Sequence, residues 1–201
     1  MPLQNRVTPF GEIVALPGRG LYTGNRGILH DERRRLVRSS QVRRWITCLL
    51  EYRGIRRVVM TPHRWTELFF LDEATAFSAG HRPCAECRRA DYQRFCNFWE
   101  IARREEAKAD AIDLALQANR RRHGAKVTYR EDLARLPDGA FVADEGRAWL
   151  VWGSQLFEWS DAGYRRRVPR PARRNVVVLT PRPLVDVLRA GYDVALHPSA
   201  S

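Results

Sequence analysis

The chain has 201 residues, which is enough to bury a hydrophobic core in one domain or in two small ones. Its 35 lysines and arginines outnumber its 23 aspartates and glutamates, and the formal net charge of +12 favours a polyanionic partner. No apolar run approaches the ~20 residues that a membrane-spanning helix needs, and the N-terminus lacks the order of a signal peptide. We therefore expect a soluble, cytoplasmic protein that has no membrane partner.

The first third of the chain alternates turn signals with strand-like stretches. Residues 18–27 are rich in glycine, and residues 44–52 and 55–60 are apolar and β-branched on either side of the turn at Arg53 and Gly54. This pattern predicts a small antiparallel unit.

The centre of the chain is predicted to be helical. Asp72 can cap a short helix that runs through Ala79, and Gly80 can end it in a left-handed conformation. A longer helix is expected further on, where apolar side chains recur every three or four residues at Tyr92, Phe95, Cys96 and Trp99. Another helical pattern covers residues 110–122 and ends at Gly124.

The last third reads as β-rich. Strands are predicted at 140–143, 147–152 and 155–159, and the short spacings between them favour two tight hairpins. The arginine- and proline-rich stretch 165–174 is typical of a mobile basic loop. A final strand at 176–179 leads into a helix that begins after Thr180 and Pro181.

Taken together, these elements predict an α+β protein, with a small antiparallel unit and helices followed by a small β-rich C-terminal part. We expect the division to fall at residues 1–100, a helical connector at 101–125, and a C-terminal subdomain with its helix at 126–201.

A metal site is predicted where Cys84 and Cys87 stand two residues apart on a tight turn. That spacing lets both thiolates reach one zinc ion, which would stabilise the N-terminal unit. His30 and Cys48 are the favoured remaining ligands, although Cys48 also alternates in phase with buried-type neighbours and fits a core position. The weaker candidates are His63, His81, Cys96, His123, His197 or a carboxylate.

The segment 67–87, ELFFLDEATAFSAGHRPCAEC, resembles the second half of the Ada-type metal-binding domain, and the upstream TGNRGILH at 23–30 is similar to the strand before that family's first ligand pair. The resemblance covers about residues 18–95 and implies a four-ligand zinc fold associated with DNA. The family's methyl-accepting cysteine is replaced here by His30, and its next ligand by Arg34. We therefore do not expect the methyl-acceptor activity, and Cys48 would have to complete the site.

A zinc-dependent nucleobase deaminase is the alternative that fits a second motif. His30 and Glu32 form an H-x-E element, and Pro83 precedes the two cysteines as in P-C-x-x-C. In that reading His30, Cys84 and Cys87 would hold zinc, and Glu32 would move the protons. The 50 residues between the two elements, with two predicted strands in them, weigh against it.

The preferred partner is nucleic acid, with DNA first, because only Lys108 and Lys126 among the 35 cations are lysines and the planar forks of arginine suit phosphates. A protein-interaction module, in which the charge reflects composition alone, remains open. The predicted contacts are the arginines beside the cysteines and those of the basic stretch, namely Arg82, Arg88, Arg89, Arg165, Arg166, Arg167, Arg173 and Arg174.

Overall fold

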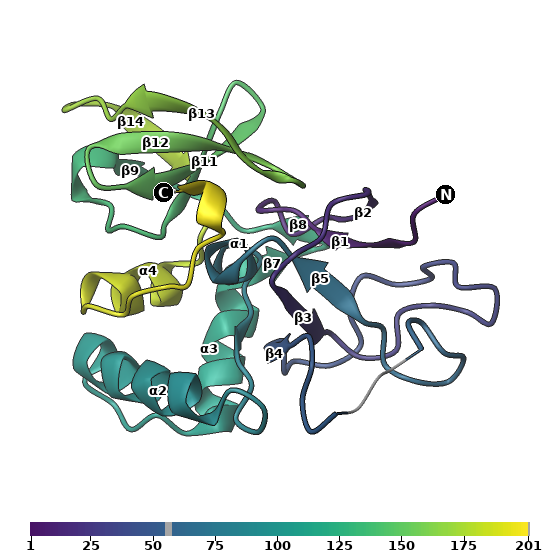
Figure 1. Ribbon diagram of the computed structural model, residues 1–201. Helices are drawn as coiled ribbons and strands as arrows, with labels where there is room; N and C mark the ends of the chain where they lie inside the picture. Colours follow the sequence, from purple (N-terminus) through teal and green to yellow (C-terminus); the bar gives the residue numbers. More distant parts are fainter. Residues whose placement is uncertain (55–57, 201) are drawn as a thin grey trace.

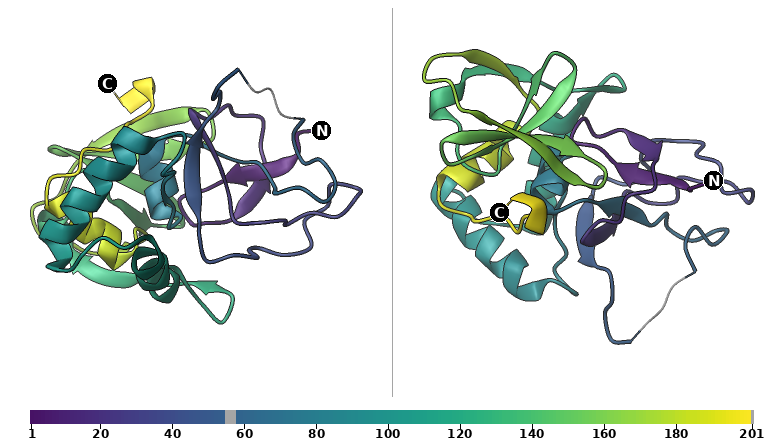
Figure 2. Two further views of the ribbon diagram at one scale, coloured as in Figure 1. Left: turned by 90° about the horizontal axis from the view of Figure 1, so that it is seen from below. Right: turned by 45° about the horizontal axis from the view of Figure 1, so that its top comes forward.

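The computed structural model describes residues 1–54 and 58–200, and within them it forms an α+β fold with two separate six-stranded sheets. Figure 1 shows the first sheet, built from the N-terminal third, beside the helices, and the second sheet, built from the C-terminal third, above them. The two further views in Figure 2 keep the first sheet to one side of the helices. In the part of the chain described here, no helix is both long enough and apolar enough to cross a membrane.

The first sheet has the strand order β2-β1-β5-β3-β4-β6. Its strands are β1 (Gln4–Val7), β2 (Ile13–Ala15), β3 (Tyr22–Asn25), β4 (Ile46–Leu49), β5 (Leu68–Phe70) and β6 (Arg82–Pro83). The pairs β1–β5 and β4–β6 are parallel and the others are antiparallel, so the unit is mixed and not wholly antiparallel as predicted. Of the strand predicted at 55–60, residues 55–57 lie outside the described residues and 58–60 form no strand.

The four α-helices of the described chain are α1 (Glu73–Ser78), α2 (Arg89–Arg103), α3 (Ala109–Arg120) and α4 (Arg182–Arg189). The predicted cap of α1 is confirmed, since the Asp72 carboxylate accepts a hydrogen bond from the Thr75 backbone N–H. Gly80 follows α1 with φ +87°, and a Cβ there would lie 2.9 Å from the Arg120 side chain. Both the left-handed backbone and this close approach require glycine.

The second sheet has the order β13-β12-β11-β10-β14-β9 and is antiparallel throughout. Its strands are β9 (Tyr129–Asp132), β10 (Phe141–Asp144), β11 (Arg147–Trp152), β12 (Gln155–Ser160), β13 (Gly163–Pro169) and β14 (Asn175–Val178). The two predicted tight hairpins are confirmed by the pairings of β11 with β10 and β12. The prediction of a mobile basic loop at 165–174 is wrong for residues 165–169, because they pair with β12 as the edge strand β13. In the sequence, β7 (Arg121–Arg122) and β8 (Ala125–Lys126) come between the two sheets and make a small hairpin. Two short 3-10 turns cover Leu133–Arg135 and Pro198–Ala200.

Most buried apolar side chains belong to one cluster that joins the helices to the second sheet. Representative members from α1, α2, α3, β10 and α4 are Phe77, Trp99, Ile112, Phe141 and Leu184. A smaller cluster, with Val7, Leu68 and Phe70 at its centre, packs the first sheet against the other side of α1. Helix α1 therefore lies between the two sheets and contributes to both cores.

The start of α1 is also joined to the C-terminal part of the chain through polar contacts. Tyr164 donates its hydroxyl to Asp72 at 2.6 Å, and Tyr192 donates its hydroxyl to Glu73 at 3.0 Å. Glu73 also pairs with Arg88 at 2.6 Å, and all of these groups are buried. Because Arg88 directly follows the second cysteine of the predicted metal turn, this network holds that turn against the body of the protein.

Candidate metal centre

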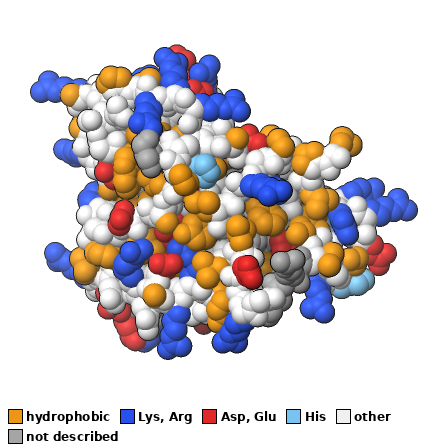
Figure 3. Space-filling model, viewed as in Figure 1, with side chains coloured by type: hydrophobic (Ala, Val, Ile, Leu, Met, Phe, Trp, Pro, Cys, Tyr) orange, Lys and Arg blue, Asp and Glu red, His pale blue; other side chains and the backbone are white. Residues whose placement is uncertain are grey.

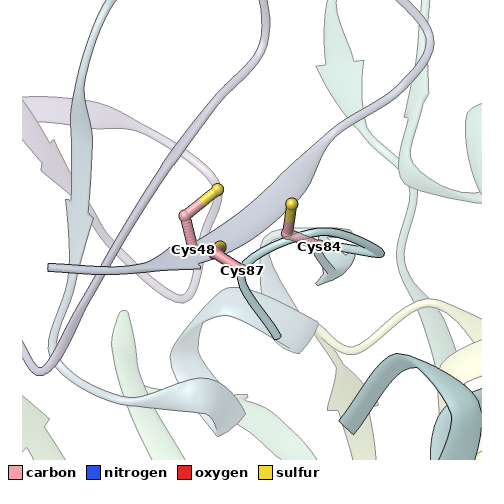
Figure 4. A group of neighbouring side chains, drawn as sticks. All are labelled: Cys48, Cys84 and Cys87. Carbon is pink, nitrogen blue, oxygen red and sulfur yellow. The ribbon is translucent and has the colours of Figure 1, made fainter. Parts of the chain in front are cut away.

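Three cysteine side chains meet beside the edge of the first sheet. Cys48 comes from β4, and Cys84 and Cys87 come from the turn that follows β6 (Figure 4). The three sulfur atoms all lie within 4.8 Å of one another. Tetrahedral zinc thiolates have Zn–S bonds of about 2.3 Å, so sulfurs at this separation can share one ion.

Backbone pairing between β4 and β6 brings the third cysteine to the turn. Strand β4 runs parallel to β6 with Thr47 opposite Pro83, and the Cys84 N–H donates to the Thr47 carbonyl at 2.9 Å. Arg88 fixes the far end of the turn, because its backbone N–H donates to the Cys84 carbonyl and its guanidinium donates to the Thr47 hydroxyl at 3.0 Å. The register thus places Cys48 next to Cys84, one residue beyond the last paired position.

The three thiols share protons unequally. A hydrogen bond from Cys48 lowers the pKa of Cys84 to about 5, and the Glu86 N–H, 3.5 Å from the Cys84 sulfur, stabilises the same thiolate. The hydrogen bond from Cys48 also lowers the pKa of Cys87, while the pKa of Cys48 itself is raised because it donates to both neighbours. At neutral pH the cluster therefore offers a thiolate at Cys84, and thiolates are the form that binds soft metal ions.

His30, the predicted fourth ligand, is not part of this cluster. Its Nδ1 atom lies 2.6 Å from the Thr66 hydroxyl and its Nε2 atom lies 3.2 Å from the Thr61 carbonyl oxygen, so both ring nitrogens have partners in the loop before β5. The imidazole is buried there as part of the packing of that loop. The closed set of one histidine and three cysteines is thus corrected to three cysteines alone.

The deaminase-type ligand set does not assemble either. His30 does not join Cys84 and Cys87, and the exposed Glu32 carboxylate lies 3.4 Å from the exposed His63 ring. Among the weaker candidates, His81 is buried against Trp45 and Phe70 and receives a hydrogen bond from Arg26.

The remaining weaker candidates also lie outside the cluster. Cys96 lies on α2, where it contacts Tyr92. His123 occupies the β7–β8 turn, and His197 bonds Ser199 near the C-terminus.

Two of the eight arginines predicted to contact nucleic acid are buried in ion pairs. Arg82 pairs with Asp113 through two contacts of 2.8 Å, and Arg88 pairs with Glu73 and Asp91. With side chains 3% and 1% exposed, they cannot face a phosphate, and this part of the prediction is corrected. The six that remain exposed are Arg89, Arg165, Arg166, Arg167, Arg173 and Arg174.

A cavity that the sequence did not reveal adjoins the cysteines. It has a volume of ≈ 830 Å³ and is lined by the three cysteines together with side chains of β3, β4, β5 and the segments around them. Its aromatic lining includes Tyr52, Trp65 and Phe69. These residues come from separate stretches of sequence with no common motif, so only the folded chain brings them together.

Comparisons with models of protein families, with curated proteins and with solved structures found no match to this chain. Functional inference therefore depends on the cysteine cluster, the cavity beside it and the distribution of charge.

Proposed function

We propose that the protein binds one zinc ion through Cys48, Cys84 and Cys87 and contacts nucleic acid, preferably DNA, through the exposed arginines of its C-terminal part. The observation that carries the metal half of the proposal is the approach of three sulfurs to within 4.8 Å. Thiolate donors select zinc among the common divalent ions, because magnesium and calcium prefer oxygen. The resemblance of the cysteine turn to the Ada-type domain supports the same metal, and His30 in place of the accepting cysteine argues against methyl transfer.

The second half of the proposal is supported by charge on the β-rich part. Arg165, Arg166 and Arg167 are exposed on the edge strand β13, and Arg173 and Arg174 follow in the connection to β14. In Figure 3 arginine and lysine side chains project from the upper edge of the molecule, over this sheet. A hollow of ≈ 500 Å³ lies beside β9 and β14, and its lining has four arginines, Arg130, Arg135, Arg173 and Arg174, against two carboxylates, Glu131 and Asp132. Such an array suits a phosphate backbone more than a neutral surface.

The metal is tested by elemental analysis of protein purified without added metal or chelator. We expect one zinc per chain in the native protein and in the Cys96→Ser variant, and a large loss of bound zinc in Cys48→Ser and Cys84→Ser. Cys96 is a matched control because it is a half-buried cysteine outside the cluster. Equal zinc content in all four proteins, or none in the native protein, would refute the site.

The nucleic-acid contact is tested by measuring affinity for duplex DNA as a function of salt. Each phosphate contact contributes about 0.9 to the slope of log K against log salt, so losing three contacts should reduce the slope by at most about 2.7. We expect a clear reduction when Arg165, Arg166 and Arg167 are all changed to glutamine. The matched control changes Arg33, Arg34 and Arg35, an exposed run in another part of the chain, which removes the same charge.

The comparison between the two triple variants decides whether the interface is local. A reduced slope in the β13 variant with a native slope in the control supports a contact at β13. Equal slopes in the two variants would mean that only total charge matters, and a flat salt dependence in the native protein would eliminate nucleic acid as a partner.

A further inference from the structure

The three cysteines leave the coordination of a bound zinc ion incomplete on the protein side. Zinc is four-coordinate in nearly all structural sites. Within residues 1–54 and 58–200, the cluster contains no fourth histidine, cysteine, aspartate or glutamate, and the positions outside those ranges are Ile55, Arg56, Arg57 and Ser201 by sequence. With no such side chain within 4.8 Å of the three sulfurs in the described residues, the fourth position is open to a donor from outside the chain. This step rests on the proposed zinc site.

The cavity beside the cysteines gives such a donor a place to enter. All three cysteines line the ≈ 830 Å³ space, so the metal would stand in its wall and not inside closed packing. Cys48 and Cys87 are only partly buried. A volume of this size lies in the range of small-molecule sites and is far larger than a single water requires.

The walls favour a flat, apolar body. Tyr52, Trp65 and Phe69 line the cavity together with aliphatic side chains of β4 and its neighbours, Ile46, Leu49 and Leu50. The Arg6 guanidinium lies 4.8 Å from the centre of the Phe69 ring, so this ring already makes a cation–π contact within the protein. Aromatic and aliphatic surfaces of this kind bind planar rings by stacking and by burial of apolar area.

Charge selects against an anionic donor. Three thiolates around Zn²⁺ carry a net charge of −1, and among the described residues the cavity is lined by three carboxylates, Glu51, Glu67 and Glu86, against two cations, Arg44 and Arg53. Glu67 is fixed in place, since its carboxylate accepts a hydrogen bond from the Met60 N–H at 2.7 Å and the residue is 6% exposed. An anion would add to this negative field, whereas a neutral nitrogen donor would not.

We propose that the zinc ion has an exchangeable fourth position that faces this cavity, and that the site takes a neutral nitrogen heterocycle whose ring lies against the aromatic wall. The site is thus a ligand-binding metal centre and not only a structural one. Cys48, Cys84 and Cys87 hold the metal, the heterocycle nitrogen completes its coordination, and Trp65 contacts the rest of the ring system.

The test uses the full chain with Co²⁺ in place of zinc, since visible absorption of cobalt reports its ligands directly. Imidazole, 4-phenylimidazole and azide are titrated separately into the cobalt protein. We expect saturable band shifts with both imidazoles, tighter binding of 4-phenylimidazole than of imidazole by at least about tenfold, and weaker binding of azide than of imidazole. X-ray absorption of the zinc protein should show three sulfurs and one lighter donor.

Several outcomes would overturn the inference. Spectra insensitive to all three ligands, or four sulfurs around the zinc, would mean a closed site, and azide binding more tightly than imidazole would contradict the choice of a neutral donor. Failure of the protein to bind cobalt or zinc at all would instead refute the proposed function, so the two failures are distinguishable.

Two variants complete the experiment. Trp65→Ala should reduce the preference for 4-phenylimidazole over imidazole while leaving the metal content and the imidazole shift in place. Cys96→Ser should leave every titration unchanged. An unchanged preference in Trp65→Ala would remove Trp65 from the ligand-binding wall.

Discussion

Arg82 and Arg88 show how much a single residue's role depends on what lies opposite it in the fold. Both flank the cysteine turn in sequence, where their charge suggests contact with a polyanion. In the structure Arg82 meets Asp113 of α3, and Arg88 meets Glu73 of α1, at positions 31 and 15 residues away. Buried guanidinium groups require such partners because an unpaired charge out of water is very costly. The sequence gives the charge of these residues, but their burial depends on helix packing.

Removing the partner of Arg82 should therefore destabilise the protein strongly. Asp113→Ala leaves a buried cation without its two 2.8 Å contacts, and loss of one member of a buried pair costs about 3–5 kcal/mol. We expect a loss of that size in the free energy of unfolding, measured by urea denaturation.

Asp186→Ala is the control, because Asp186 forms a 2.9 Å pair with Arg189 on α4 whose side chains are 37% and 47% exposed. An exposed pair contributes about 0–1 kcal/mol. Equal losses in the two variants would show that the Arg82 pair contributes no more than a surface pair.

A second group of cations lies near Trp45 and the end of α1. Arg26 and Arg120 stand over the Trp45 ring at 4.0 Å each, and Lys126 donates to the Ser78 carbonyl at 2.6 Å. Desolvation lowers the pKa of Lys126 to about 7, and repulsion from Arg26 and Arg121 acts in the same direction. The folded protein therefore disfavours the charged form of this lysine.

Stability should rise with pH as a result. Between about pH 7 and the ordinary lysine pKa of 10.5, the unfolded chain holds a proton at Lys126 that the folded chain has lost, so the free energy of unfolding increases with pH. Lys126→Met should flatten this dependence relative to the native protein when urea denaturation is repeated across that range. Lys108→Met alters an exposed lysine and should leave the pH dependence of the free energy of unfolding unchanged. Parallel curves of unfolding free energy against pH for the native protein and Lys126→Met would contradict the pKa shift.

At the scale of elements, local signals predict much of the fold. The α1 cap at Asp72, the helical repeat of α2 and the tight hairpins of the second sheet depend on residues close together in sequence, and each is confirmed. The edge strand β13 was missed because its three consecutive arginines resemble a solvated loop. On an edge strand such side chains are tolerated, since one side of the strand faces solvent, and Arg167 lies 5.0 Å from the centre of the Phe157 ring on β12.

The Asp72 side chain does more than cap α1. Besides capping Thr75, the buried Asp72 carboxylate accepts the Tyr164 hydroxyl from β13 and the His197 N–H from the C-terminal segment. Asp72→Ala should therefore cost the cap, about 1 kcal/mol, and roughly 1–3 kcal/mol more for the buried donors left without partners.

The matched control is Asp132→Ala, which removes a comparable cap from a short 3-10 turn at the surface, where among the described residues the carboxylate accepts a hydrogen bond from the Ala134 N–H alone. Chemical denaturation should show the larger loss in Asp72→Ala by more than 1 kcal/mol. Similar losses would indicate that the contacts of Asp72 to the C-terminal part add nothing to stability.

For the molecule as a whole, sequence spacing predicts the pair Cys84 and Cys87, and strand alternation leaves Cys48 open between ligand and core. The position of Cys48 is decided by the parallel pairing of β4 with β6, a contact between residues 36 positions apart for which no local signal exists. His30 was favoured for its position in a loop, yet Thr66 and Thr61 satisfy its ring elsewhere. The cavity was beyond prediction because its lining depends on the same long-range pairings.

A metal held between β4 and the cysteine turn links segments far apart in the chain, so its removal should affect global stability. A ligand that binds only the folded state stabilises it by about 2.7 kcal/mol when free ligand is 100 times the Kd. For a protein of this size that corresponds to a shift in Tm of roughly 5–11 °C. We expect exhaustive chelation to lower the Tm of the native protein by about this amount.

Cys48→Ser provides the decisive comparison. If Cys48 is a ligand of the stabilising metal, the Tm of this variant should lie near that of the chelated native protein, and chelation should change it little. Chelation should lower the Tm of Cys96→Ser as much as that of the native protein. The two effects are then non-additive, as expected for changes that remove one interaction. A full chelation response in Cys48→Ser would mean that the stabilising metal binds elsewhere, and no response in the native protein would mean that the fold is independent of metal.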